Sequence, residues 1–151
     1  SLARLTETQL LIIGKDKHSN KLQRLITDMG LTKRVHVIGP QKNLLPYWNA
    51  ADVFCLPSLY DSFPNAALEA ISHGTPCVLS DGVGIADQFV TAGVAIKTTR
   101  DPDALAHAIS TAIRDRKSMA PKTRAFASKF SPELVVPLWE NLYSEIMSGK
   151  H

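Results

Sequence analysis

The chain has 151 residues, a length that suits a single domain with a buried core. Apolar residues make up 44% of it and charged residues 21%, as in an ordinary globular protein, and no apolar run approaches the roughly 18 residues that span a membrane. A net charge of +3 suits an anionic ligand but is too small to predict binding to nucleic acid or to a membrane surface.

The cysteines and the first residues bear on the cellular compartment. Cys55 and Cys77 both fall in apolar, strand-like runs. We therefore expect two buried, reduced thiols, as in a reducing compartment. No signal peptide is recognisable. The sequence thus predicts a cytoplasmic protein, and peripheral contact with the inner face of a membrane is compatible with that prediction.

Strands and helices alternate along the first two thirds of the chain. The apolar run 9–14 predicts a first strand, and a helix capped by Ser19 or Asn20 follows it to Met29. The pattern continues with strands at 35–39, 53–56, 77–80 and 93–96, and with helices at 44–51, 64–73 and 85–91. After that only helices are expected, one starting at 101, one over 116–129 and one capped by Ser131.

This alternation predicts an α/β fold: a Rossmann-like, doubly wound parallel sheet with a helical C-terminal segment. Ligands of such sheets bind at the carboxyl ends of the strands. Gly82 and Gly84 at that edge suit either an anion cradle or a plain turn, and we favour the turn because a lone Gly-x-Gly is a weak signal. No residue group has the spacing of metal ligands. The loops expected to line one cleft are 14–18, 39–43, 57–65 and 80–84.

The stretch 57–70 carries the most chemistry. It reads as the end of a strand, a polar loop and the start of a helix, with Asp61 in the loop and Glu69 on the helix. A helix start offers free N–H groups to a phosphate, here those of Asn65 and Ala66, and a carboxylate can accept two hydrogen bonds from a vicinal diol. From spacing alone, a ligand site formed by these carboxylates and a plain solvated surface are equally favoured.

Residues 49–78 resemble the central signature of the group 1 retaining glycosyltransferases, which have the GT-B fold. The match includes Ala51-Asp52 before the strand, Pro57-Ser58 after it, an E-x7-E-like pair formed by Asp61 and Glu69, and Gly74-Thr75-Pro76. Looser matches extend over essentially the whole chain. The loop Gly-Lys-Asp-Lys at 14–17 looks most like the lipopolysaccharide-core glucosyltransferases.

The resemblance implies transfer, with retention, of a sugar from a nucleotide-sugar such as UDP-glucose to an acceptor glycan or lipid-linked saccharide. It implies no cofactor and no obligatory metal. Glu69 would hold the ribose diol and Asp61 the donor sugar. The diphosphate and sugar would meet Ser62, Phe63, Pro64, Asn65 and Ala66. The base would face Gly14, Lys15, Asp16, Lys17, Gly39, Pro40 and Gln41.

The chain departs from the family pattern in two ways. The first motif position is usually Glu, and Asp61 keeps its charge on a side chain one methylene shorter. The domain's first strand and the separate N-terminal acceptor domain, which supplies a catalytic His, are expected to be absent. We therefore read 1–151 as a donor-binding domain truncated at its N-terminus and inactive by itself.

Loss of a central strand would leave the strands at 10–13 and 52–56 without their shared neighbour. We expect the chain to compensate in one of three ways: by pairing these two strands directly, by dimerising or by rearranging. Two other functions remain open for the protein. One is a nucleotide-sugar epimerase of the same fold, and the other is a non-catalytic nucleotide-binding module in which the shorter Asp61 marks lost activity.

Overall fold

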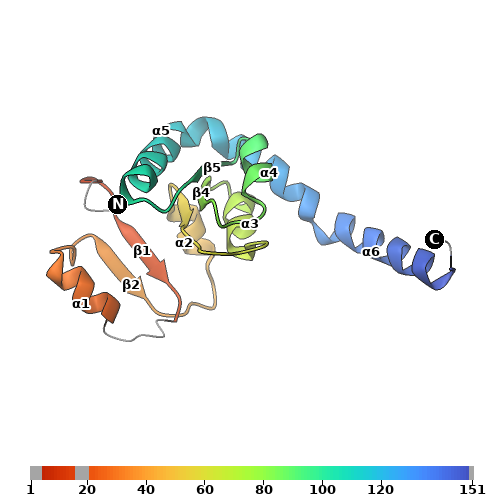
Figure 1. Ribbon diagram of the computed structural model, residues 1–151, viewed down its shortest axis with the longest axis horizontal. Helices are drawn as coiled ribbons and strands as arrows, with labels where there is room; N and C mark the ends of the chain where they lie inside the picture. The colour runs from red at the N-terminus through yellow and green to blue at the C-terminus, as the bar shows by residue number, and fades with distance from the viewer. Residues whose placement is uncertain (1–4, 16–20, 150–151) are drawn as a thin grey trace.

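The computed structural model of the chain describes residues 5–15 and 21–149 (Figure 1). It has the predicted α/β architecture, with short parallel strands and intervening helices. No helix in these described ranges is both long and apolar enough to cross a membrane. The elements up to the last strand are β1 (Leu10–Ile13), α1 (Lys21–Asp28), β2 (Val35–Ile38), α2 (Leu45–Ala50), β3 (Phe54–Leu56), α3 (Asn65–Ser72), β4 (Cys77–Ser80), α4 (Ala86–Thr91) and β5 (Ala95–Thr98).

The strands form two separate parallel sheets. One contains β1 and β2, and the other has the order β3-β4-β5. Within the described residues β1 and β3 do not pair, so the expectation of direct pairing between these two strands is wrong. Their apolar residues are only partly buried, whereas every residue of β4 is buried. Each sheet therefore has an open edge formed by a strand whose composition suits the interior.

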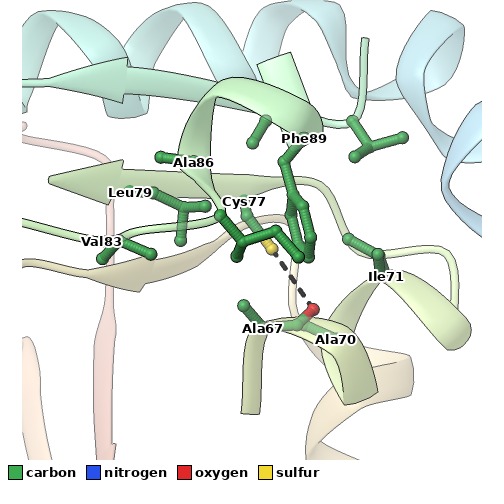
Figure 2. Close-up of a cluster of buried hydrophobic side chains, with 11 residues drawn as sticks. Ala67, Ala70, Ile71, Cys77, Leu79, Val83, Ala86 and Phe89 are labelled. Carbon is green, nitrogen blue, oxygen red and sulfur yellow. Dashed lines mark hydrogen bonds between the residues drawn. The ribbon is translucent and has the colours of Figure 1, made fainter. Parts of the chain in front are cut away.

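The main core lies between β4 and the helices α3 and α4 (Figure 2). Phe89 of α4 and Ile71 of α3 are fully buried, and the Cys77 thiol donates a weak hydrogen bond to the carbonyl of Ala67 at 3.7 Å. The small residues Ala67 and Ala70 let α3 approach the sheet closely, because they add almost no bulk to the buried face of the helix. This packing fixes where α3 begins.

The helical C-terminal segment differs from its prediction. Two helices were expected over 101–129, but α5 (Pro102–Ala127) is one continuous helix of 26 residues with Pro121 inside it, followed by the 3₁₀ turn η2 (Ser128–Phe130). A buried stripe runs through the position where the two helices were expected to separate, from Ala108 and Ala112 to Met119 and Thr123. Packing of this stripe against the rest of the fold outweighs the local disruption by Pro121.

The last helix, α6 (Pro132–Met147), extends away from the rest of the molecule (Figure 1). None of its residues is buried, and most of its apolar side chains, including Leu138 and Trp139, are exposed. Smaller differences concern boundaries. β5 starts two residues later than predicted, and Pro64 is the N-cap of α3 rather than its first helical residue. Such shifts are ordinary at element ends.

Candidate functional site

The loop between β3 and α3 ends in a helix start with free donors. Pro64 is buried and has an extended backbone, with φ −75° and ψ 103°, which turns the chain into the helix. The first N–H groups of a helix have no partner inside it. Those of Asn65 and Ala66 appear in none of the hydrogen bonds described for this loop, and both residues are exposed. This end of α3 can therefore donate to an anion.

Glu69 lies on the same exposed face of α3 as these donors. It follows Asn65 and Ala66 by four and three residues, the spacing of neighbours on one helix face, while the opposite face is buried. The Cα–Cβ bond of a helical residue tilts toward the N-terminus of its helix, so the Glu69 side chain leaves the backbone in the direction of the helix start. No ion pair joins Glu69 to another described residue.

Asp61 is half-buried, and hydrogen bonds of its backbone hold it in place. Its N–H donates to the carbonyl of Gly82 at 3.0 Å, and its carbonyl accepts from the N–H of Gly84 at 2.8 Å. The two loops form an isolated parallel bridge between Asp61 and Val83. The loops 57–65 and 80–84 are therefore in direct contact, and the Asp61 backbone is fixed between β3 and α3.

The glycine-rich loop behaves as a structural turn in this structure. The N–H of Val83 donates to Ser80 at 3.1 Å and that of Gly84 donates to Asp61, so these groups are already used within the protein. An anion cradle needs several free N–H groups converging on one point. The arrangement agrees with the turn that the sequence analysis favoured for Gly82 and Gly84.

The loops assigned to the base lie next to each other. β1 and β2 pair in register from Leu10 and Val35 to Ile13 and Ile38, which brings the loop after each strand to one edge. Gly14 has φ +143°, a conformation that favours glycine, and the neighbouring Lys15 is exposed. Gly39, Pro40 and Gln41 are also exposed, and the Gln41 side-chain amide donates to Gly39 at 3.3 Å. Asp16 and Lys17 lie outside the described residues.

The four loops meet as two pairs, and the open sheet edges lie between the pairs. Two hollows of about 310 and 210 Å³ lie elsewhere on the described part of the chain, beside α1 and beside the middle of α5. None of the candidate residues lines either hollow. The candidate site is thus an open surface at the carboxyl ends of the strands, and it lies in neither of these two hollows.

A chain of aromatic rings also supports the Asp61 loop. Phe63 packs edge-on against Phe130 of η2, with ring centroids 5.8 Å apart, and Phe130 packs on Phe126 at 5.3 Å. Phe126 in turn contacts the buried Phe89 at 5.2 Å. Sequence reasoning missed this support because it joins residues far apart in the chain, and no local pattern marks them as neighbours.

The family model described as glycosyl transferases group 1 matches residues 1–115. The chain belongs to this family. The family prediction made from residues 49–78 is therefore confirmed, and so is the GT-B-like fold that it implied.

This group 1 glycosyltransferase chain is also similar to a curated protein in sequence and to solved structures in fold. An exopolysaccharide phosphotransferase of Streptomyces coelicolor is 30% identical over 148 residues, which cover 94% of this chain and 16% of that protein. A sucrose-phosphate synthase from Thermosynechococcus elongatus superposes with a TM-score of 0.87 at 24% identity, over 99% of this chain and 41% of that one. HepE from Anabaena, solved in complex with UDP-glucose, superposes with a TM-score of 0.75 at 27% identity. The superposition covers 90% of this chain and 41% of the HepE chain.

The chain thus spans well under half the length of these relatives. The superposition covers both sheets, including their open edges, because it includes nearly the whole of this chain and a single solved chain. The two sheets are therefore placed relative to each other as in a larger known fold. No comparison assigns a role to Asp61, Glu69 or the loop residues, whose roles stay predictions.

Proposed function

We propose that the protein transfers a sugar, with retention, from a nucleotide-sugar to a saccharide acceptor, and that these residues bind the donor. The observation that carries the proposal is the exposed end of α3. There, Glu69 shares one face with the free N–H groups of Asn65 and Ala66, and Asp61 is held close by in the preceding loop. Membership of the group 1 glycosyltransferases supports the reaction class.

The helix start would stabilise the leaving group. When the bond between the sugar and the diphosphate breaks, negative charge develops on the diphosphate and positive charge on the sugar ring. The N–H groups of Asn65 and Ala66, with the positive end of the helix dipole, are fixed before the reaction and need no reorganisation. The backbone of Ser62 and Phe63, just before the buried Pro64, borders the same position.

The two carboxylates would have different roles. Glu69, leaning along α3 toward the helix start, would accept hydrogen bonds from the ribose diol. Asp61 would accept hydrogen bonds from hydroxyl groups of the donor sugar, near the carbon that reacts. We propose that its shorter side chain sets which sugar fits, because it reaches less far than the Glu usual in the family.

The base would lie over the edge formed by the paired loops after β1 and β2. Their exposed groups are Lys15, Gly39, Pro40 and the Gln41 amide, and Gly14 beside them is half-buried. A UDP-sugar is the donor that we propose, since HepE was solved with UDP-glucose and shares 27% identity over most of this chain.

We also propose that residues 1–151 are part of a donor-binding domain and that one more strand completes its sheet between β1 and β3. Two open, apolar strand edges placed as in a known fold support this idea. The acceptor would bind to a part of the protein outside these residues. A glycan or lipid-linked saccharide, as in lipopolysaccharide-core assembly, is the acceptor class that we propose, and the chain alone would be inactive.

The test uses the whole protein, a panel of UDP-, GDP- and ADP-sugars and the variants Glu69→Ala and Asp61→Ala. Loss of the ribose contacts in Glu69→Ala should weaken donor binding about 10- to 100-fold, the range for hydrogen bonds to a charged group. Asp61→Ala should reduce turnover more than donor affinity, and Asp61→Glu should change the preferred sugar. Glu145→Ala, which removes an exposed carboxylate from α6, is the matched control.

Several outcomes would contradict the proposal. Unchanged donor affinity in Glu69→Ala would remove the ribose role, and unchanged transfer in both variants would remove the catalytic role of the pair. Nucleotide binding without transfer would indicate a binding module, and interconversion of free nucleotide-sugars would indicate an epimerase. The anomeric configuration of the product, read by NMR, tests retention. Transfer should persist in EDTA, because we propose that protein groups alone meet the diphosphate charge.

A further inference from the structure

The loop 80–84 approaches the Asp61 loop more closely than side chains allow. A Cβ atom built on Gly82 would lie 2.3 Å from the carbonyl oxygen of Leu59 and 2.7 Å from its carbonyl carbon. One built on Gly84 would lie 2.9 Å from the carbonyl oxygen of Ser62. Ordinary contacts of this kind begin near 3.4 Å. The atoms in the way belong to backbone, which cannot rotate aside as a side chain can.

Neither glycine is needed for its backbone angles. The glycines with positive φ are at other positions among the described residues, namely Gly14, Gly30, Gly74, Gly93 and Gly149. Gly82 and Gly84 therefore occur where two stretches of backbone meet, and it is their missing side chain that matters. Both flank Val83, the residue that forms the parallel bridge with Asp61.

Hydrogen bonds complete this contact. The N–H of Asp61 donates to Gly82 and the N–H of Gly84 donates back to Asp61, at 3.0 and 2.8 Å. The hydroxyl of Ser80, fully buried at the end of β4, donates to the carbonyl of Ser58 at 2.6 Å. Three hydrogen bonds thus join the loops at both ends of the segment 58–61.

We propose that Gly82 and Gly84 are positioning residues that fix the Asp61 carboxylate for the reaction, by letting the 80–84 loop clamp the backbone of the Asp61 loop. This inference rests on the role proposed above for Asp61. Every residue of β4 is buried, so the clamp ties Asp61 to the most completely buried strand of the sheet. A catalytic group needs such support, because a misplacement of about 1 Å can reduce a rate 100-fold.

The test compares Gly82→Ala and Gly84→Ala in the whole protein. In Gly82→Ala the Leu59 carbonyl must withdraw by about 1 Å, so kcat should fall about 100-fold while the affinity for UDP changes little. Gly84→Ala meets a milder clash and should lose less, and Ser80→Ala should lie between this variant and wild type. Gly93→Ala, strained at φ +69° and remote from the loop, is the control for general destabilisation. It should lower Tm without lowering kcat.

Amide hydrogen exchange gives a second readout that does not depend on activity. Exchange should accelerate at the Asp61 and Gly84 amides in Gly82→Ala and stay slow at Cys77, whose N–H donates to Val94 in the core. If Gly82→Ala keeps wild-type kcat, or leaves the Asp61 amide protected, the inference is wrong. If wild type transfers no sugar from any donor, the proposed function fails, and the exchange data alone then decide whether the clamp exists.

Discussion

At the scale of single residues, the two thiols show how burial shifts a pKa. Cys77 is fully buried and Cys55 is half-buried on the neighbouring strand, and both are free. Burial raises the pKa of Cys55 to about 11, and it raises that of Cys77 further, with the nearby Cys55 adding to the effect. Both thiols therefore stay protonated at neutral pH and are poor nucleophiles.

This predicts a loss of stability in alkali. In the unfolded chain both thiols ionise near pH 8.5, but in the folded chain they stay neutral to higher pH. The folded state then holds more protons, so the free energy of unfolding should fall as pH rises from about 8.5 to 11, by up to about 1.4 kcal/mol per pH unit for each thiol. Urea unfolding at several pH values measures this. A Cys55→Ala/Cys77→Ala variant with the same slope would contradict it.

At the scale of the elements, the N-cap of α5 predicts how much one side chain contributes to stability. The Asp101 carboxylate accepts from the N–H groups of Asp103 and Ala104, each at 2.9 Å, and Pro102 occupies the first turn. Asp101→Ala should therefore lower the free energy of unfolding by about 1 kcal/mol. Asp101→Asn keeps an acceptor oxygen and should lose less. Equal losses in urea unfolding would show that the cap is not the cause.

The exposure of α6 predicts that truncating a large apolar side chain there will have little effect on stability. Leu138 of α6 is 67% exposed, whereas Ile71 of α3 is completely buried. Leu138→Ala should change the stability of the 151-residue chain by less than about 0.5 kcal/mol, and Ile71→Ala should cost about 2–5 kcal/mol. Denaturant midpoints compare the two. A large loss for Leu138→Ala would mean that α6 packs against something in solution, such as a second copy of the chain.

At the scale of the whole molecule, the open sheet is the dominant feature. The N–H groups of Leu10 and Gly14 donate toward β2, so by alternation those of Leu11 and Ile13 point to the open edge. On β3 the N–H of Phe54 donates toward β4, which leaves that of Cys55 at the open edge. These edge amides have no strand partner among the described residues.

Their exchange rates test the open edge and the proposed extra strand together. In the 151-residue chain the amides of Leu11, Ile13 and Cys55 should exchange far faster than those of Leu10 and Leu79. In the whole protein the same three should become protected. If they are slow in the short chain at every concentration, the edge is not open. Protection that disappears on dilution would indicate that a dimer covers it.

Much of the fold was predictable because its signals are local. The apolar runs of β1, β2 and β4 mark parallel strands, of which β4 is buried throughout, and the glycine at Gly74, with φ +94°, ends α3 where expected. Asp61 and Glu69 were recognised from their spacing and from the surrounding family motif. A strand, a cap or a motif is encoded by adjacent residues, so these features can be read without knowing the rest of the fold.

Contacts between distant segments could not be read in this way. The sequence alone determined the α/β class, the family and the two carboxylates at a helix start. Only the tertiary structure decided that Gly82 and Gly84 lie against the backbone of the Asp61 loop, that α5 runs through Pro121, that α6 is exposed and that β1 and β3 do not pair directly. These outcomes depend on which elements fill the neighbouring space, and a local pattern of residues carries no information about that.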